Sequence, residues 1–364
     1  MDFSEHKNLP NKDGEGFLFA FSGMDGKTCH AANFVLTRYR TGYDFLIQTE
    51  YLHELRIRTM ESGTVLAATG DVYAVQFGGE QLLLTFSAWH TLIGQIPAGA
   101  SIALFDGNEE KTTSICNRQD GMLTFLIEGD RFALSYGANE DEAQTRAKRG
   151  LPVPVEETIN QRLVIYEQLP HLVDDRDDRL LRKCFSVMKV NAMSAEGKFL
   201  QHWSTPDRVP HRDMWLWDSV FHSLAMNKVD AELSWKYLKS VLDQQSEEGM
   251  ISHQFRPTGW RSSITQPPIL AWGVWENYQA NPNKEHLMFA AERLAKYLQW
   301  DMRNRDQNGN GLMEWFIEEN EDCRSGESGM DNSQRFDEAL LLDAVDFSVF
   351  AALDMEYPAK MYAV

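Results

Sequence analysis

The hydrophobic pattern of the chain changes period once, and this change limits what the chain can fold into. From about Phe17 to Tyr136, short runs rich in β-branched and aromatic residues alternate with turn residues. Glycine-containing turns stand between these runs at 78–79, 106–107 and 120–121. From about Glu157 the apolar residues recur at helical spacing. The pattern predicts an antiparallel β-sandwich or half-barrel followed by a helical region, and a helical hairpin is the alternative for any single run.

These periods divide the chain of 364 residues into three parts. Residues 1–145 are predicted to form the β-sandwich, and the charged, proline-containing segment 146–170 a linker with the first helix. Residues 171–364 hold the remaining helices. Seven helical stretches are expected, at about 157–169, 175–193, 215–228, 230–246, 268–280, 284–304 and 337–364.

Composition excludes several classes of partner. The formal net charge is −19, which disfavours nucleic acid and anionic membranes, because both require neutralisation by Lys and Arg. No apolar run approaches the length of a membrane span, and residues 1–15 lack the hydrophobic core of a signal peptide. The four cysteines are far apart, so we expect reduced thiols in a cytoplasmic protein. The oligomeric state stays open.

Tryptophan is concentrated in the helical region, where nine of the ten lie between Trp203 and Trp315. Trp235 and Trp300 fall inside amphipathic helices and are expected to be buried. Five others lie in or beside loops: Trp203, Trp215, Trp217, Trp260 and Trp315. Flat aromatic faces flanked by carboxylates and amides suit the stacking of sugar rings. The alternative is that these residues only fill a large helical core.

Two loop clusters carry groups suited to sugar chemistry. Residues 204–222 hold hydrogen-bonding and stacking side chains beside an apolar helix start: Asp207, Arg208, His211, Arg212, Asp213, Trp215, Trp217, Asp218 and His222. Residues 314–337 present Glu327, Asp331 and Asp337 among glycines and serines. Glycosidases need two carboxyl groups that flank the scissile bond. Helix caps and surface ion pairs are the alternative for each residue singly.

Two shorter motifs are less specific. Gln266 precedes Pro267 and Pro268 at an expected helix start, where its side chain would meet a ligand hydroxyl; a simple helix start is the alternative. Oxygen ligands at Asp306, Asn308, Asn310 and Glu314 match the beginning of a calcium loop, but Ile317 stands where that loop needs a glutamate. A tight Asn/Gly turn without metal is the alternative to structural calcium. Motifs for nucleotide, zinc or serine-nucleophile chemistry are missing, so no cofactor is expected to be required.

Four segments in order resemble glycoside hydrolase family 63 and its bacterial relatives, which include α-glucosidases and mannosylglycerate hydrolase-like enzymes. They read TPDRVPHRDMWLWDSVFH (205–222), TQPPILAW (265–272), DQNGNGLMEW (306–315) and ESGMDNSQRFD (327–337), and FAFSGMDGK (19–27) is also similar. Trehalases of family 37 have a related loop, but the MDNS form favours family 63.

The resemblance implies a β-sandwich followed by an (α/α)6 barrel, and inverting hydrolysis of α-glucosides or related small oligosaccharides. It implies Asp331 as the general acid, with Trp217 and Asp218 binding the sugar at the cleavage subsite. The remaining cleft residues it suggests are Arg212, Asp213, Gln266, Trp272, Trp315 and Glu327. We expect burial or a neighbouring charge, with Glu327 the candidate, to raise the pKa of Asp331.

The general base of the family is a glutamate near the end of the barrel, which we expect beyond Val364. A closed barrel of six helical hairpins needs twelve helices, so seven stretches predict a partial barrel with one apolar side exposed. Two alternatives to the hydrolase remain: a non-catalytic carbohydrate-binding protein or decayed fragment, and a glycoside phosphorylase on the same scaffold.

Overall fold

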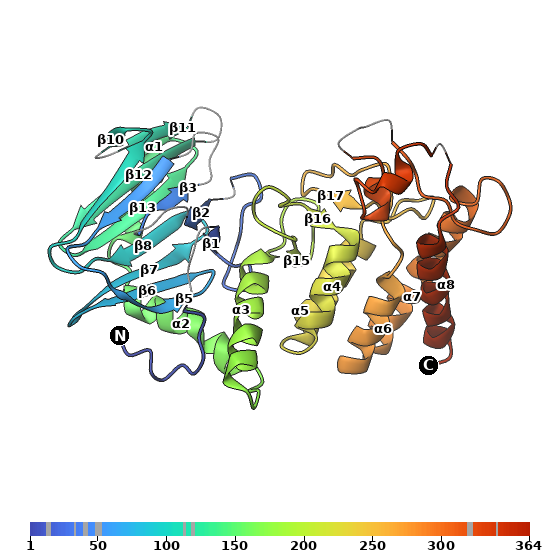
Figure 1. The fold of residues 1–364 in the computed structure, drawn as a ribbon, viewed down its shortest axis with the longest axis horizontal. Coiled ribbons are helices and arrows are strands. Elements are labelled where there is room, and N and C mark those ends of the chain that lie inside the picture. Colours follow the sequence, from blue (N-terminus) through green and yellow to red (C-terminus); the bar gives the residue numbers. More distant parts are fainter. Residues whose placement is uncertain are drawn as a thin grey trace. The chain divides into compact units, whose positions relative to one another are not determined.

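The computed structural model describes residues 1–11, 16–32, 34–38, 43–47, 53–111, 114–117 (backbone only), 121–318, 323–339 and 341–364. The chain forms two compact units, Met1–Ser194 and Ala195–Val364, called here the first and the second unit. Each is described by itself (Figure 1).

The first unit contains two antiparallel sheets. One has the strand order β1-β2-β3-β4-β9-β10 and the other β11-β12-β13-β8-β7-β6-β5. Their bounds are β1 Phe17–Ala20, β2 Val35–Arg38, β3 Phe45–Ile47, β4 His53–Arg58, β5 Thr64–Ala68, β6 Val72–Phe77, β7 Glu80–Ala88, β8 Thr91–Gln95, β9 Ser101–Asp106, β10 Glu109–Lys111, β11 Ser114–Asn117, β12 Gly121–Glu128 and β13 Arg131–Gly137.

Both sheets contribute to one hydrophobic core, so the predicted β-sandwich is confirmed. Phe19 of β1 packs on Phe86 of β7, with 5.2 Å between the ring centroids. Two of the predicted turns close hairpins, because Phe77 pairs with Glu80 and Asp106 with Glu109. Of the third turn, residue 120 lies outside the described residues.

The described residues of the first unit form three helices, α1 (Glu140–Gly150), α2 (Val155–Glu167) and α3 (Asp175–Asn191). Asn139 caps α1, which lies against β12 and β13 (Figure 1). Two helices therefore occupy most of the segment predicted as a linker with one helix. The first compact unit ends at Ser194, and the predicted boundaries at 145 and 170 lie within it. Buried charges connect α2 and α3 to the sandwich.

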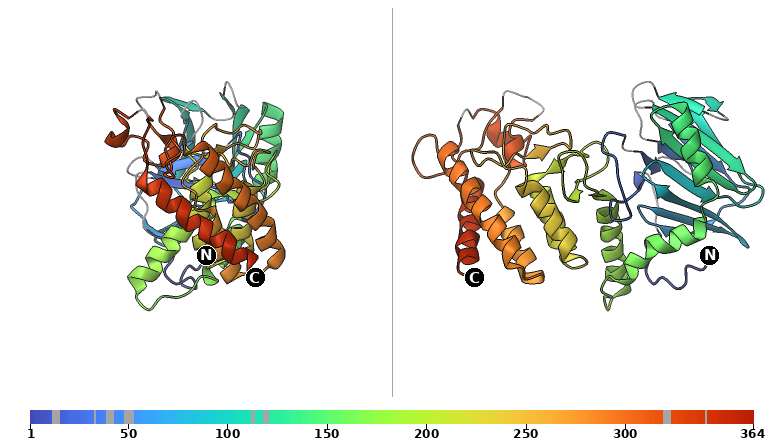
Figure 2. Two further views of the ribbon diagram at one scale, coloured as in Figure 1. Left: turned by 90° about the vertical axis from the view of Figure 1, so that its right-hand side faces the viewer. Right: turned by 180° about the vertical axis from the view of Figure 1, so that it is seen from behind.

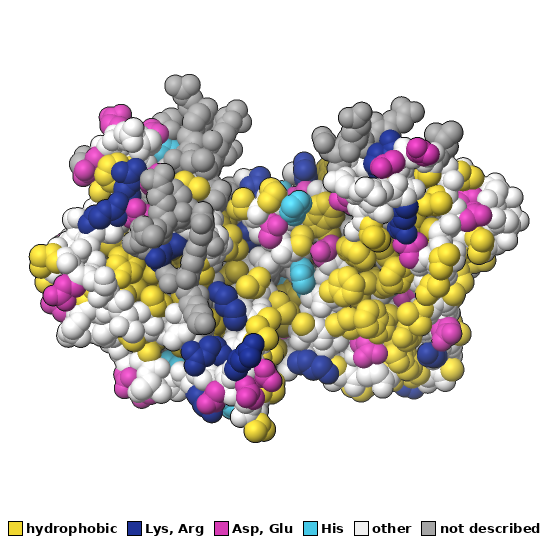
Figure 3. Space-filling view, viewed as in Figure 1, with side chains coloured by type: hydrophobic (Ala, Val, Ile, Leu, Met, Phe, Trp, Pro, Cys, Tyr) yellow, Lys and Arg dark blue, Asp and Glu magenta, His cyan; other side chains and the backbone are white. Residues whose placement is uncertain are grey.

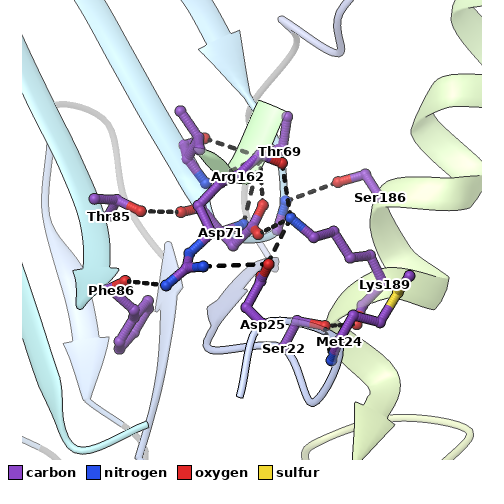
Figure 4. A network of polar contacts seen from close by, with 12 residues as sticks. Ser22, Met24, Asp25, Thr69, Asp71, Thr85, Phe86, Arg162, Ser186 and Lys189 are labelled. Atoms are coloured by element: carbon purple, nitrogen blue, oxygen red, sulfur yellow. Dashed lines mark hydrogen bonds and ion pairs between the residues drawn. The ribbon is translucent and has the colours of Figure 1, made fainter. Parts of the chain in front are cut away.

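Those charges form a network between the two helices and two turns of the sandwich (Figure 4). Lys189 of α3 is 1% exposed and pairs with Asp71, and its Nζ lies 3.3 Å from Asp25. Arg162 of α2 reaches the other oxygen of Asp25 at 3.2 Å. Thr69 donates to Asp71 over 3.0 Å. The positive charges of the two cations thus match the negative charges of the two carboxylates inside the first unit.

The second unit is helical, with α4 (Leu216–Met226), α5 (Ala231–Leu242), α6 (Leu270–Ala280), α7 (Lys284–Asn304) and α8 (Val345–Tyr362). The 3-10 turns η1 (Gly326–Ser328) and η2 (Gln334–Phe336) precede α8. The remaining short strands of the chain are β14 (Ala192–Met193), β15 (Trp203–Ser204), β16 (Met214–Trp215) and β17 (Gln254–Phe255). Within this unit α4, α6 and α8 lie in one row, and α5 and α7 pack behind them (Figure 2).

All seven predicted helical stretches are present among the described residues, as α2 to α8. The last begins at Val345 rather than near 337, because the chain first forms η2 and pairs Asp343 with Glu314. An apolar stripe runs along α8, where Val345, Val349 and Leu353 are 80%, 59% and 42% exposed. Figure 3 shows apolar side chains gathered on the surface of this unit.

Among the cysteines with described side chains, Cys184 and Cys323 form no disulfide bond. In the described part of the chain, none of the helices combines the length and the apolar character needed to cross a membrane.

Candidate active site

The second unit contains a cavity of about 740 Å³. That volume is typical of a small-molecule site. Its wall comes from three segments, the start of α4 with the loop before it, the loop after β17, and the loop around η1. The lining residues are Pro206, His211, Trp215, Trp217, Asp218, His253, Gln254, Trp260, Arg261, Ser262, Ser263, Ile264, Gln266, Glu318, Cys323, Gly326, Gly329 and Asp331.

The start of α4 is fixed by neighbours on both sides. The N–H of Leu216 donates to the carbonyl of His253 over 3.0 Å. The side-chain oxygen of Gln266 accepts the N–H of Trp217 at 3.1 Å and so caps the first turn. Gln266 is buried and also lines the cavity. Its side chain can therefore cap α4 and still lie beside a ligand, as predicted from the sequence. Trp217 and Asp218 consequently face the cavity from a rigid helix end.

The surroundings of Asp218 alter the titration of its carboxyl group. Burial raises its pKa to about 6, against the weaker opposing effects of a backbone hydrogen bond and of nearby His211. Burial lowers the pKa of His253 to about 4, so this ring is neutral at pH 7. Its Nδ1 contacts the hydroxyl of Ser262. The cavity therefore offers a carboxylate that gains or loses its proton just below neutral pH.

The loop around η1 brings Asp331 to the cavity wall. Its carbonyl accepts the N–H groups of Arg324 and Ser325 at 2.9 and 3.2 Å, which closes the loop. Gly329 has φ +67° and lies against the indole of Trp217, where a Cβ would overlap the ring. The side chain of Asp331 is exposed and lines the same cavity as Trp217 and Asp218.

Glu327 supports this loop from behind and does not line the cavity. It is buried and forms a bidentate ion pair with Arg305, at 2.7 and 2.8 Å. It also accepts the N–H groups of Thr265 at 3.0 Å and Phe316 at 3.2 Å. Its charge is thus matched by a buried guanidinium, and the side chain ties three segments together.

Four further predicted cleft residues lie outside the lining. Trp315 is buried and stacks on Phe347, with 4.0 Å between the ring centroids. Asp213 is buried and accepts hydrogen bonds from Gln254 and Arg256. Trp272 and Arg212 are half-buried. The interpretation of loop tryptophans as sugar platforms therefore fits Trp215, Trp217 and Trp260, whereas Trp203 is buried like Trp315.

Several lining residues were not selected from the sequence. The loop after β17 contributes Arg261 to Ile264, and the segment before η1 contributes Glu318 and Cys323. The sequence placed residues 247–267 in a long loop between helices, and such loops often hold binding residues. That position was the signal that could have identified these lining residues. Trp235 and Trp300 are buried, as their helical spacing predicts.

The predicted calcium loop closes on its own hydrogen bonds. Glu314 accepts the N–H groups of Gln307 and Asn308, and the amides of Asn308 and Asn310 donate to Asp343 at 3.0 and 2.8 Å. Asp306 Oδ2 accepts the N–H of Gly311 at 3.1 Å, while Oδ1 is buried and has no hydrogen-bond partner among the described residues.

The side-chain oxygens of Asn308 and Asn310 accept the N–H groups of Asn310 and Leu312 at 3.0 and 2.9 Å. In the part of the chain that the structure describes, His, Cys, Asp and Glu side chains form no group of three placed to bind a metal ion. Calcium therefore stays a prediction that rests on Asp306 and the two amide side chains.

Comparison with known proteins agrees with the resemblance to family 63. Residues 210–361 match the sequence profile of the mannosylglycerate hydrolase MGH1-like glycoside hydrolase domain. The matched residues lie within the second unit, which is therefore similar to a glycoside hydrolase domain of this type. Mannosylglycerate hydrolase MGH1 of Selaginella moellendorffii is 29% identical over 189 residues, which are 44% of this chain and 37% of that protein.

Two bacterial proteins are also similar to this chain. The mannosylglycerate hydrolase of Thermus thermophilus is 32% identical over 150 residues, 35% of this chain and 34% of that protein. The crystal structure of a GH63 mannosylglycerate hydrolase from another strain of Thermus thermophilus aligns with a TM-score of 0.37 and 24% identity, over 50% of this chain and 53% of that one. The chain spans about a third of the length of the curated relatives it matches.

Proposed function

We propose that the second unit hydrolyses the α-glycosidic bond of a small carbohydrate with inversion, and that Asp331 is the general acid. The observation that carries the proposal is that one cavity brings Asp331 together with Trp217 and Asp218. A carboxylic acid beside a sugar-binding surface is the arrangement that protonation of a leaving oxygen requires. The helices would form part of an (α/α)6 barrel.

In this proposal Trp217 and Asp218 hold the sugar whose bond is cleaved. The indole is fixed by Gly329 and by Phe221, whose ring centroid lies 5.6 Å away. A sugar ring stacks on such a surface through its C–H groups. With a pKa of about 6, Asp218 is mostly ionised at pH 7 and accepts hydrogen bonds from sugar hydroxyls. This pair orients the anomeric carbon toward the loop that bears Asp331.

The acid must be protonated when the bond breaks. Asp331 is exposed in the open cavity, so a bound substrate would cover it and displace water. Loss of water disfavours the ionised carboxyl and thereby favours the acid form. Inversion further requires a second carboxylate, roughly 6.5–9.5 Å from the first, to activate the attacking water.

The substrate class is proposed from two sources. The relatives are named mannosylglycerate hydrolases. The resemblance to family 63 points to α-glucosides and related small oligosaccharides. We therefore propose small α-glycosides of glucose or mannose. The free thiols of Cys184 and Cys323 and the acidic charge fit a protein of the cytoplasm that acts on a neutral sugar.

The test is a substrate screen with the intact protein, in which NMR records the anomer first released. The panel holds mannosylglycerate, glucosylglycerate, maltose and α-1,2-mannobiose. Asp331→Asn should lower kcat/KM by about 10²–10⁴-fold. The matched control is Asp337→Asn, an exposed acid on the same segment that does not line the cavity.

Each contrary outcome identifies a different error. Unchanged hydrolysis by Asp331→Asn would refute the assignment of the acid, and release of the retained anomer would refute inversion. Sugar binding without turnover would favour the non-catalytic carbohydrate-binding protein. Turnover that depends on added phosphate would favour the glycoside phosphorylase.

A further inference from the structure

Trp260 enters the cavity from a short hairpin of fixed shape. The N–H of Arg256 donates to the carbonyl of Trp260 at 2.9 Å, and that of Ser262 to the carbonyl of Gln254 at 3.1 Å. Gly259 at the tip has φ +94°, a conformation that favours glycine. The tip is anchored by the N–H of Lys198, which donates to the carbonyl of Pro257 at 2.8 Å.

The indole is also supported from one side. The guanidinium of Arg256 lies over the Trp260 ring, 4.6 Å from its centroid. Nε of Arg256 donates to the buried carboxylate of Asp213 at 2.9 Å, and Gln254 donates to the same oxygen at 2.5 Å. A buried acid therefore fixes a cation, and the cation fixes one face of an aromatic ring. This gives Asp213, which does not line the cavity, a positioning role.

Trp260 is nevertheless 45% exposed, and it lines the cavity. A large apolar surface held rigidly in water costs free energy that a stacked ligand would recover. Arg261, the next residue, is exposed on the same wall and offers donors to hydroxyl groups. Trp260 and Arg261 therefore form a binding surface that is already ordered before a ligand binds.

The cavity thus holds two separate aromatic surfaces. Trp217 packs on Phe221 and Gly329 beside the loop of Asp331, whereas Trp260 packs on Arg256 in the hairpin. The two indoles therefore belong to different walls of the cavity and rest on different supports. The volume of about 740 Å³ is enough for a ligand larger than a monosaccharide.

We propose that Trp260, supported by Arg256 and Asp213, is the stacking platform for a second sugar ring. The preferred substrate is then an oligosaccharide with at least two rings, rather than a sugar joined to an acyclic acid. This inference rests on the proposed function, because it places the first ring on Trp217 and Asp218.

The experiment measures binding in the Asp331→Asn background, so that turnover is not required. Isothermal titration compares maltose and α-1,2-mannobiose with methyl α-glucoside and methyl α-mannoside. Trp260→Ala should weaken the binding of the better disaccharide about tenfold and leave its methyl glycoside unchanged. Trp260→Phe should restore most of the affinity. Trp275→Ala, a tryptophan of α6 outside the cavity lining, is the control.

The positioning residues are tested with the same ligands. Asp213→Asn and Arg256→Met should weaken disaccharide binding by a smaller factor, and Arg256→Lys should retain more of it, because a cation remains over the ring. In the active protein, Trp260→Ala should raise KM for the disaccharide by a larger factor than KM for an α-glycosyl fluoride, whose leaving group has no ring.

The outcomes separate this inference from the proposed function. Equal affinity for the disaccharide and its methyl glycoside, or a Trp260→Ala variant that binds disaccharide normally, would overturn the second ring site. Disaccharide binding that depends on Trp260 in a protein without hydrolytic activity would support the ring site and refute the hydrolase. Loss of all sugar binding in folded Asp331→Asn would overturn both.

Discussion

Replacing Lys189 by methionine removes the central cation of the first unit and keeps most of the side-chain volume. Its Nζ pairs with Asp71, lies 3.3 Å from Asp25 and donates to the carbonyl of Arg162 at 2.9 Å. After the change Asp25 still has the guanidinium of Arg162 at 3.2 Å. Asp71, which is 1% exposed, keeps only neutral donors such as Thr69.

The expected loss of stability follows from that unpaired carboxylate. Removing one partner of a buried ion pair typically costs about 3–5 kcal/mol, because the remaining charge stays desolvated. Methionine fills the space of the lysine stem, so a cavity adds little. For a unit of about 190 residues, at about 2–4 °C per kcal/mol, the melting temperature should fall by roughly 6–20 °C. Adding Asp71→Asn to the variant should restore part of this, since the buried charge is gone.

The assay is thermal and urea unfolding of the intact protein, followed by circular dichroism at a wavelength dominated by the sheets. Lys27→Met is the matched control, because Lys27 is an exposed lysine in the loop that contains Asp25. A Lys189→Met variant within about 1 kcal/mol of this control would refute the reasoning, since surface substitutions usually stay within about 0.5 kcal/mol. A double variant less stable than Lys189→Met would refute the account based on Asp71.

Three further predictions concern the second unit. Between about pH 4 and 6, the folded state keeps a proton on Asp218 that the unfolded state has lost, so the free energy of unfolding falls as pH rises through that range. Asp218→Asn should therefore stabilise the protein at pH 7 by about 1–2 kcal/mol. In fluorimetric melting curves, the difference between variant and wild type should vanish near pH 4. Gly329→Ala adds a Cβ that overlaps the indole of Trp217, at a residue whose φ is +67°. This substitution should weaken sugar binding at least tenfold. Normal sugar binding, measured by isothermal titration, would contradict the packing of Gly329 on Trp217. Millimolar calcium should raise the melting temperature of the wild type but not that of Asp306→Asn. At a hundredfold excess of calcium over Kd, the free energy of unfolding should increase by about 2.7 kcal/mol. Equal responses of the two proteins would favour the metal-free turn.

Local sequence signals predicted the elements of the fold well. Hairpins at 78–79 and 106–107 follow from glycines next to alternating strands. Helix starts follow from caps such as Asn283, whose side chain accepts two N–H groups of α7. The pairing of Lys189 with Asp71 joins residues 118 positions apart and connects α3 to the sandwich. Periodicity carries no information about such partners.

The candidate site was predicted in part for the same reason. Trp217, Asp218, Gln266 and Asp331 line one cavity, as their motifs imply. Glu327 belongs to the same motif as Asp331 but turns inward to Arg305, since the side chains of a glycine-containing loop do not follow a fixed period. Trp260 was noted only as a loop tryptophan, because its support comes from Asp213, 47 positions earlier in the sequence.

The buried charges of the first unit also bear on how a β-sandwich of this kind can pass from one gene to another. A segment that ended at residue 145 or 170 would carry Asp25 and Asp71 without Lys189, and the shorter one would lack Arg162 as well. A recombination event that transfers the sandwich intact must therefore include α3. The exchangeable module is the sandwich together with α1, α2 and α3, although the periodicity of α2 and α3 is that of the helical region.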